Sequence, residues 1–596
     1  MKLDFDQVDA IFSALVASGH APGIAYGVIA DGDLVHCGGA GVGQFGSNHT
    51  PDQDSVFRIA SLTKSFTASA VLRLRDAGAL NLDDTVATYL PEVAAVGLPT
   101  VDSPPLTIRH LLTMSAGLPT DDAWADRQES MTQDAFAALL RGGIGFISAP
   151  GTAFEYSNLG FAMLGRVVTE VAGREYRDEV VAALLTPLGM RQTAFTYRDA
   201  DASHLTCGYR HGREGWVPLP FDRPGVFSAI GGLYSSVADL ARWVSGFATA
   251  FPARDEPDNH PLSRASRRDM QQLHRFIPSP PVLGIDGSHA WANIGGYGYG
   301  LFVEEHPTGP IISHPGGYPG YGAHMRWSTT VGVGVIALAN ATYAPVHQPA
   351  AEALAALLSG FRRPTSTPWP ATLRAAHDVS RLLTSWDDDV ADKLFAPNVD
   401  LDVPRDERRD QFDAARSSVG YGPNGPNDDA ERATHTTPAA AAWVTPGSHG
   451  WISVDVQLTP QLPAQVQSVV VKVVGEPSPR VTSAAADLLK ALNSVPPRWP
   501  TELAYGNDVD PGRLLSAATA ARAVDGPFGA LGELVDCMNP DSVAYQLRTA
   551  TASWHLFLAI DPDTGALTRA ELRPAGLLPT TTSHAGQASP GSVDPR

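Results

Sequence analysis

Lysine is the residue that this 596-residue sequence most nearly lacks. The 43 Lys and Arg residues include only five lysines, which are Lys2, Lys64, Lys393, Lys472 and Lys490. Arginine can replace a lysine on the surface at little cost, but a guanidinium does not give up its proton near neutral pH. Lys2 and Lys64 are the only lysines in the first 390 residues. Lys64 is therefore a candidate for a role that needs a neutral amine.

Positive charge is also scarce, because 63 acidic residues outnumber the 43 basic ones and the formal net charge is −20. Such a chain has no general electrostatic attraction to nucleic acid or to anionic membranes, so we expect neither as a partner. The sequence has no apolar run of about 18 residues, which excludes a predicted membrane span. The N-terminal segment 1–20 contains three aspartates and has helical apolar spacing, unlike a signal peptide.

Cysteine is rare and its spacing carries no motif. Cys37, Cys207 and Cys537 are far apart, odd in number and fit no zinc-binding pattern. We read them as unpaired thiols and expect a cytoplasmic protein with no metal and no other cofactor. Gly41 to Gly46 match Gly-x-Gly-x-x-Gly after a predicted strand, but a polar loop follows instead of a helix, so a dinucleotide site is excluded.

The length predicts two to four domains, and the 56 glycines and 48 prolines indicate a loop-rich globular protein. A Pro-punctuated segment (FRRPTSTPWP) begins at Phe361. We predict a first domain over 1–360, a linker over 361–372, a C-terminal accessory region over 373–578 and a disordered tail over 579–596.

In the first domain, residues 23–39 read as a β-hairpin with Asp31-Gly32 at its turn. Residues 61–77 read as a helix, 80–250 as mostly helical, and 251–296 as a polar surface loop. Four strand-like runs follow between 297 and 339, and 347–361 reads as a closing helix. Strands at both ends with helices between them predict an α+β domain whose sheet is completed by both termini.

The C-terminal region begins with a helical pattern over 373–394 and ends in strands, so an α+β or β-rich fold is expected. Residues 451–471 and 554–572 each read as Trp, strand, Pro-containing turn and strand. These hairpins belong either to duplicated modules or to unrelated ones. Residues 420–438 are of low complexity.

Ser61-Leu62-Thr63-Lys64 forms a Ser-x-x-Lys motif, which places the amine one helical turn from the hydroxyl. A serine hydroxyl needs a base to become a nucleophile, and a desolvated, neutral lysine can supply one. The motif alone is weak evidence, but the scarcity of lysine makes a chance occurrence less expected here.

Tyr156-Ser157-Asn158 precedes a helical run. Tyr156 could carry a proton if the Lys64 ammonium lowered the pKa of its phenol, and Asn158 could orient both Lys64 and a substrate carbonyl. The alternative for this tripeptide is a turn with a helix N-cap.

His314-Pro315-Gly316-Gly317 ends a predicted strand. A glycine-rich strand lets a substrate backbone lie alongside, and the Gly317 N–H could be a second oxyanion donor beside the Ser61 N–H. The alternative is a structural histidine before a turn.

The order and spacing of these three motifs resemble the serine β-lactamase and penicillin-binding-protein-like superfamily. The resemblance is strongest to the branch of class C β-lactamases, D-alanyl-D-alanine carboxypeptidases, D-aminopeptidases and esterases. It covers roughly residues 5–345 and includes FRIASLTKSFTA (57–68), LTIRHLLTMSAGLP (106–119), PGTAFEYSNLGFAMLG (150–165) and GGLYSSVADLARWV (231–244). It implies a five-stranded antiparallel sheet flanked by helices, with an α-helical subdomain and the active site between them.

The resemblance also implies roles for residues. Ser61 would be the acylated nucleophile, and Lys64 and Tyr156 would share general-base and general-acid duty. Asn158, His314 and Gly316 would bind substrate. His314 stands where many relatives carry the Lys of a Lys-Thr-Gly motif, and a neutral imidazole is a poorer carboxylate anchor, which favours the peptidase or esterase branches over β-lactamases.

We therefore expect a serine hydrolase that forms an acyl-enzyme and cleaves an amide or ester in a small molecule or peptide, with D-amino-acid peptides among the candidates. One alternative is a stand-alone peptide cyclase or acyltransferase that uses the same acyl-enzyme. Another is a non-catalytic binding or sensor protein with the same fold. The sequence leaves the oligomeric state open.

Overall fold

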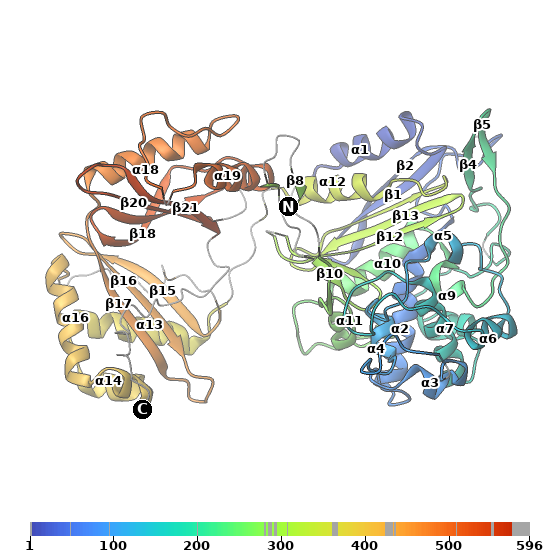
Figure 1. Cartoon of the computed structure of the whole chain (residues 1–596), viewed down its shortest axis with the longest axis horizontal. Helices are drawn as coiled ribbons and strands as arrows, with labels where there is room; N and C mark the ends of the chain where they lie inside the picture. The colour runs from blue at the N-terminus through green and yellow to red at the C-terminus, as the bar shows by residue number, and fades with distance from the viewer. Residues whose placement is uncertain are drawn as a thin grey trace, which may run out of the picture. The chain divides into compact units, whose positions relative to one another are not determined.

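The computed structural model describes residues 3–574 except 48, 95, 200, 279–281, 284–288, 291–294, 307, 360, 362–366, 423–432, 434–436, 508 and 550–552. The predicted tail over 579–596 lies outside the described residues, as do parts of the predicted linker (361–372) and low-complexity segment (420–438). The chain divides into two compact units (Figure 1). Met1–Val282 and Ala292–Phe361 form the first, and Leu283–Trp291 and Arg362–Arg596 form the second.

An antiparallel sheet of eight strands forms the frame of the first unit, in the order β2-β1-β14-β13-β12-β11-β10-β7. Its strands are β1 (Gly23–Ala30), β2 (Asp33–Gly41), β7 (Arg275–Phe276), β10 (Gly295–Tyr297), β11 (Phe302–Glu304), β12 (Ile311–Tyr318), β13 (Tyr321–Ser328) and β14 (Gly334–Ala339). The first and last long strands, β1 and β14, pair directly, so both ends of the domain complete the sheet as predicted. The five strands implied by the resemblance are the long ones, and three short strands extend them at one edge.

Helices cover both faces of this sheet, which explains why all eight residues of β1 are buried. Side chains alternate along a strand, so Ile24 and Tyr26 pack on α1 (Phe5–Ala17) and α12 (His347–Leu358). Ala25 and Ile29 face the opposite side, where they join a larger core with α2 (Thr63–Asp76) and α10 (Val237–Ala248) (Figure 1).

A helical subdomain is inserted between β2 and β7. Its remaining helices are α3 (Val86–Tyr89), α4 (Ile108–Leu112), α5 (Asp122–Ala125), α6 (Gln133–Arg141), α7 (Asn158–Ala172), α8 (Tyr176–Val180) and α9 (Ser228–Gly231), with a π-helical turn at Val181–Leu185 and 3-10 turns η1 (Ala60–Leu62) and η2 (Pro91–Val93). Short strand pairs are β3 (Phe57–Arg58) with β6 (Tyr234–Ser235), and β4 (Tyr209–Gly212) with β5 (Gly215–Pro218). Helix α7 contacts α2, α4 and α9 and forms the centre of the subdomain.

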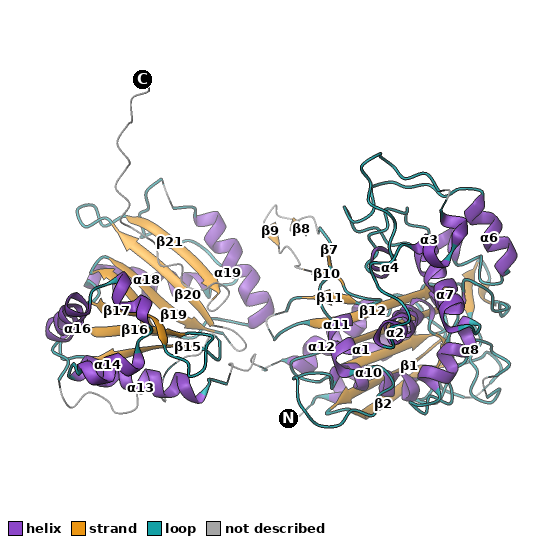
Figure 2. Cartoon of the chain, turned by 90° about the horizontal axis from the view of Figure 1, so that it is seen from below, coloured by secondary structure: helices purple, strands orange, loops and turns teal. Residues whose placement is uncertain are grey.

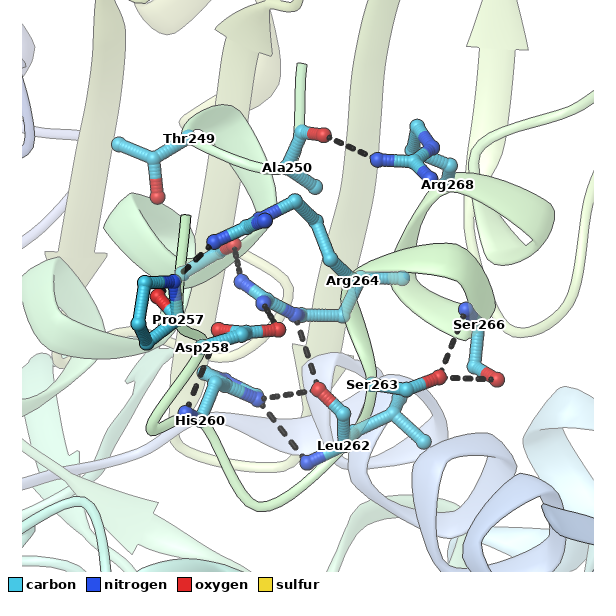
Figure 3. A network of polar contacts seen from close by, with 12 residues as sticks. Thr249, Ala250, Pro257, Asp258, His260, Leu262, Ser263, Arg264, Ser266 and Arg268 are labelled. Atoms are coloured by element: carbon cyan, nitrogen blue, oxygen red, sulfur yellow. Dashed lines mark hydrogen bonds and ion pairs between the residues drawn. The ribbon is translucent and has the colours of Figure 1, made fainter. Parts of the chain in front are cut away.

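The prediction of a polar surface loop over 251–296 is wrong in part. The segment contains helix α11 (Arg264–Met270) and strands β7, β8 (Val282–Leu283) and β9 (His289–Ala290), and β10 begins within it. Polar contacts organise it: Leu262 N–H donates to His260 Nδ1 over 3.1 Å (Figure 3). The Arg264 guanidinium donates to the backbone carbonyls of Arg254, Glu256 and Pro257. The order of this segment comes from hydrogen bonds of arginine and of the half-buried His260 imidazole, whereas the prediction from sequence relied on apolar periodicity.

The second unit contains two antiparallel sheets, each with its own helices and core (Figure 2). The first has strands β15 (Ala440–Pro446), β16 (Trp451–Leu458) and β17 (Val466–Val474) with helices α13 (Pro370–Thr384), α14 (Asp388–Leu394), α15 (Pro397–Asp402) and α16 (Arg405–Val419). The second has β18 (Leu531–Asn539), β19 (Ser542–Arg548), β20 (Ser553–Ile560) and β21 (Leu567–Pro574) with helices α18 (Pro479–Leu492) and α19 (Pro511–Asp525). Both predicted hairpins are present as the last two strands of their sheets. The β-rich C-terminal region is thus separate from the first fold.

Candidate active site

Ser61 lies in the 3-10 turn η1, directly before α2 begins at Thr63. The preceding residue, Ala60, has a φ of +49°, a backbone conformation that costs energy for a residue with a Cβ. The predicted helix over 61–77 is therefore present as a 3-10 turn followed by α2. Ser61 remains partly exposed at the start of this helix, while its neighbours Ala60 and Leu62 are buried.

Lys64 is fully buried on the first turn of α2, and its Nζ donates to two acceptors. One is Ser61 Oγ at 3.0 Å, and the other is the backbone carbonyl of Ile230 in α9, also at 3.0 Å. Burial lowers the pKa of Lys64 to about 8, against the opposing charges of Asp122, Asp126 and Asp121. The amine can therefore be neutral in an accessible pH range while it touches the Ser61 hydroxyl.

Tyr156 lies beside the same group, because a side-chain interaction with Ser61 acts to lower the pKa of its phenol. Lys64 Nζ lies over the Tyr156 ring, 5.0 Å from its centroid. Burial raises the pKa of Tyr156 well above its ordinary value of 10, and nearby Tyr297 and Asp122 act in the same direction. The expectation that Lys64 lowers this pKa is wrong, because desolvation of the phenolate is the dominant effect here. Tyr156 is a neutral phenol near neutral pH.

Asn158 is the first residue of α7 and is 1% exposed. Its Nδ2 donates to Asp121 Oδ1 at 3.1 Å and to Asp122 Oδ1 at 2.7 Å. Its Oδ1 is buried and has no hydrogen-bond partner among the described residues. What Asn158 offers to a substrate is therefore this oxygen. The helix-cap alternative also holds for its neighbour, since Ser157 accepts from Gly160 N–H at the N-terminus of α7.

Strand β12 lies against the turn that carries Ser61 and contributes His314, Gly316 and Gly317. A Cβ at Gly316 would lie 2.5 Å from the carbonyl oxygen of Ile59, so only glycine allows this close approach. A Cβ at Gly317 would lie 2.7 Å from Cδ1 of Tyr343. The glycines therefore let β12 pass close to the Ser61 turn, as the oxyanion hypothesis requires.

His314 is fully buried. Its Nδ1 donates to the Pro315 carbonyl at 2.6 Å, and its Nε2 accepts from the Tyr297 hydroxyl at 3.1 Å. Burial, together with the charge of Lys64, lowers the pKa of His314 to about 3. A neutral imidazole with both nitrogens engaged is not a cationic anchor for a substrate carboxylate.

Sequence reasoning missed the acidic side of the site. Asp121, Asp122 and Asp126 lie close enough to Lys64 to raise its pKa, and Asp126 accepts a 2.7 Å hydrogen bond from the Tyr343 hydroxyl. The signal was available as three aspartates in six residues, directly after the LTIRHLLTMSAGLP motif. Among the described residues, no group of three or more His, Cys, Asp or Glu side chains is arranged to hold a metal ion.

A buried ion pair also stabilises the elements that form the site. Arg58 in β3 is 1% exposed and donates to Glu129 Oε2 at 2.8 Å and to the Gly231 carbonyl at 3.0 Å. Its guanidinium lies 3.6 Å from the centroid of the Tyr318 ring at the end of β12. Arg58 thus links β3, which precedes the Ser61 turn, to helix α9, whose Ile230 carbonyl accepts from Lys64, and to the glycine-containing strand β12.

The fold and the grouping of Ser61, Lys64 and Tyr156 define a protein of the β-lactamase and penicillin-binding-protein-like superfamily. The family model described as Beta-lactamase matches residues 8–359, which is more than half of the chain. The chain therefore belongs to the Beta-lactamase family.

Curated relatives and solved structures agree with this assignment. "Protein flp" of Staphylococcus aureus (strain MRSA252) is 25% identical over 342 residues, which cover 56% of this chain but only 62% of that protein. The "D-alanyl-D-alanine-carboxypeptidase/endopeptidase AmpH" of Escherichia coli (strain K12) is 27% identical over 330 residues, 54% of this chain and 80% of that protein. The structure of the octameric penicillin-binding protein homologue from Pyrococcus abyssi superposes with a TM-score of 0.52 at 19% identity, over 96% of this chain and all of that one. Among the described residues, no helix combines the length and the apolarity needed to cross a membrane.

Proposed function

We propose that this chain is a serine hydrolase that forms an acyl-enzyme on Ser61 and cleaves an amide or ester. The observation that carries the proposal is the 3.0 Å contact between Ser61 Oγ and Lys64 Nζ, combined with a Lys64 pKa lowered to about 8. A nucleophile and a base of suitable pKa within hydrogen-bond distance are what acyl transfer requires.

In the acylation step, neutral Lys64 takes the Ser61 proton as Oγ bonds to the substrate carbonyl carbon. The oxyanion accepts hydrogen bonds from the N–H groups of Ser61 and Gly317. The carbon–leaving-group bond then breaks, and Tyr156 gives its phenolic proton to the leaving group while Lys64 returns a proton to Tyr156. Water then attacks the acyl-enzyme ester on Ser61 through the same steps, and the acid product is released. The high pKa of Tyr156 supports a proton-donor role, because a phenolate would not persist.

Two observations support a substrate class in this proposal: the similarity to a curated relative and the neutral state of the His314 side chain. The similarity to AmpH, named as a D-alanyl-D-alanine carboxypeptidase and endopeptidase, supports peptides that contain D-amino acids. Neutral, buried His314 does not favour recognition of a free carboxylate next to the scissile bond. Amides and esters without that carboxylate are therefore preferred in the proposal over β-lactams.

A fluorophosphonate probe tests the proposal, because it phosphonylates an activated serine. The wild-type chain should be labelled at Ser61, and Ser61→Ala should abolish both labelling and hydrolysis of p-nitrophenyl esters and aminoacyl p-nitroanilides. Ser417→Ala is the matched control, because Ser417 is exposed on α16 in the second unit. Equal labelling or equal turnover by Ser61→Ala would refute the proposal. A product mass with no added water would indicate acyl transfer or cyclisation in place of hydrolysis.

A further inference from the structure

His324 is a buried histidine that lies outside the candidate active site. Its neighbours in β13, Ala323 and Met325, belong to the core that also contains Leu62 of the Ser61 turn. Side chains alternate along a strand, so His324 points to the opposite face of the sheet, which α12 covers. His324 is 3% exposed there. It is therefore a titratable group inside the scaffold that the proposed acyl transfer does not use.

Neither ring nitrogen of His324 has a hydrogen-bond partner among the described residues. The residues directly opposite it on the adjacent strands are Pro315 in β12 and Ala337 in β14, and neither side chain can donate or accept a hydrogen bond. A neutral imidazole carries one donor and one acceptor, and each destabilises the folded state when it is buried without a partner. The folded structure therefore contains this imidazole without gaining a hydrogen bond from it.

The positive charges around His324 oppose its protonation. Burial is the largest cause that lowers the pKa of His324 well below its ordinary value of 6.5, and Arg326, His347 and His314 act in the same direction. Arg326 follows in β13, His347 is the first residue of α12, and His314 lies in the neighbouring strand β12. A proton on His324 would therefore be both desolvated and repelled in the folded state.

The described elements packed against His324 provide no free carboxylate for such a cation. Strands β12 and β14 contain no acidic residue, and the only one in α12 is Glu352, which accepts from Gln348 of the same helix at 2.9 Å. Glu304 in β11 is paired with Arg326. Water is then the group that could solvate a protonated His324, which requires that α12 move away from the sheet.

We propose that the packing of α12 on β13 is a pH-sensitive switch, which opens when His324 takes up a proton. A histidine whose pKa is lower in the closed state than in the open state leaves the closed state at full stability above about pH 6.5, and that stability is lost as the pH falls. One proton bound on opening raises the opening constant about tenfold per pH unit below that value. The switch belongs to the scaffold, so it does not depend on the proposed reaction of Ser61.

Amide hydrogen exchange of the full-length chain, measured by mass spectrometry at low protein concentration and corrected for the intrinsic exchange rate, reports the opening of α12. Between pH 7 and pH 5 the opening constant of α12 should rise about 25-fold more in the wild-type chain than in His324→Met. Methionine is a flexible apolar side chain without a titratable group, so it can fill the same space. His377→Met is the matched control, because His377 is exposed on α13 in the second unit, and it should keep the wild-type rise.

An equal rise in the wild-type chain and in His324→Met would overturn the proposal. If His324→Met does not fold, the wild-type chain decides, because α10 covers the opposite face of the same sheet. Exchange of α12 should accelerate at pH 5 while α10 stays protected. Equal acceleration of both helices would indicate general unfolding and would refute a switch at α12. Labelling of Ser61 at pH 7 tests the proposed function separately, so the two failures are distinguishable.

Discussion

Lys64→Arg tests whether the side chain at this position must be able to lose its proton. The scarcity of lysine first suggested this requirement. With a pKa of about 8, about one tenth of the Lys64 side chains are neutral at pH 7. An arginine with a pKa above about 12 has a neutral fraction smaller by at least about four orders of magnitude. Positioned general-base catalysis contributes about 10²- to 10⁴-fold. We therefore expect Lys64→Arg to slow Ser61 acylation by at least about 100-fold.

The assay is the rate of Ser61 labelling by a fluorophosphonate probe, measured between pH 6 and 9, with circular dichroism to confirm folding. A base must be deprotonated to act, so the wild-type rate should rise about tenfold per pH unit below pH 8 and level off above it. Lys64→Arg should show no such inflection. A variant within tenfold of the wild-type rate at pH 7, or a flat wild-type profile across this range, would refute the assignment of Lys64 as the base.

Two further predictions concern the scaffold around the site. Glu129→Gln should lower the free energy of unfolding by about 3–5 kcal/mol, because it removes the buried carboxylate of Arg58 and leaves only the exposed Asp222 at 3.9 Å, and a loss below about 1 kcal/mol in urea titrations would contradict this reasoning. Gly316→Ala should slow Ser61 labelling by more than about tenfold, because its Cβ would lie 2.5 Å from the Ile59 carbonyl and push β12 off the Ser61 turn; Gly332→Ala, at a surface turn with φ of +73°, is the comparison that controls for loss of a glycine alone.

Local signals in the sequence predicted much of the first domain. The Asp31-Gly32 turn predicted the β1–β2 hairpin, and the four strand patterns between 297 and 339 predicted the strands from β11 to β14. These signals work because a two-residue turn and a period of two are properties of neighbouring residues. The pairing of β1 with β14 joins residues about 310 positions apart, and it was predicted only from the presence of strands at both ends.

The residues of the candidate site that belong to a sequence motif were predictable. The contacts that distant parts of the chain make with them were not. Ser61 and Lys64 share a helical turn, so their contact follows from spacing. The second acceptor of Lys64 is the carbonyl of Ile230, and a backbone group leaves no mark in the side-chain pattern. The direction of the Tyr156 pKa also depended on desolvation of its phenol, which is set by elements from distant parts of the chain.

The positive charges near the site bear on the substrate class that we propose. The family resemblance implies a lysine where His314 stands, whereas burial keeps the His314 imidazole neutral with its nitrogens bound to Pro315 and Tyr297. The charge of Arg58 is matched by Glu129, so it does not replace that lysine. Neither His314 nor Arg58 therefore offers an unmatched positive charge, and we expect the proposed acyl-enzyme reaction to gain little from a carboxylate beside the scissile bond.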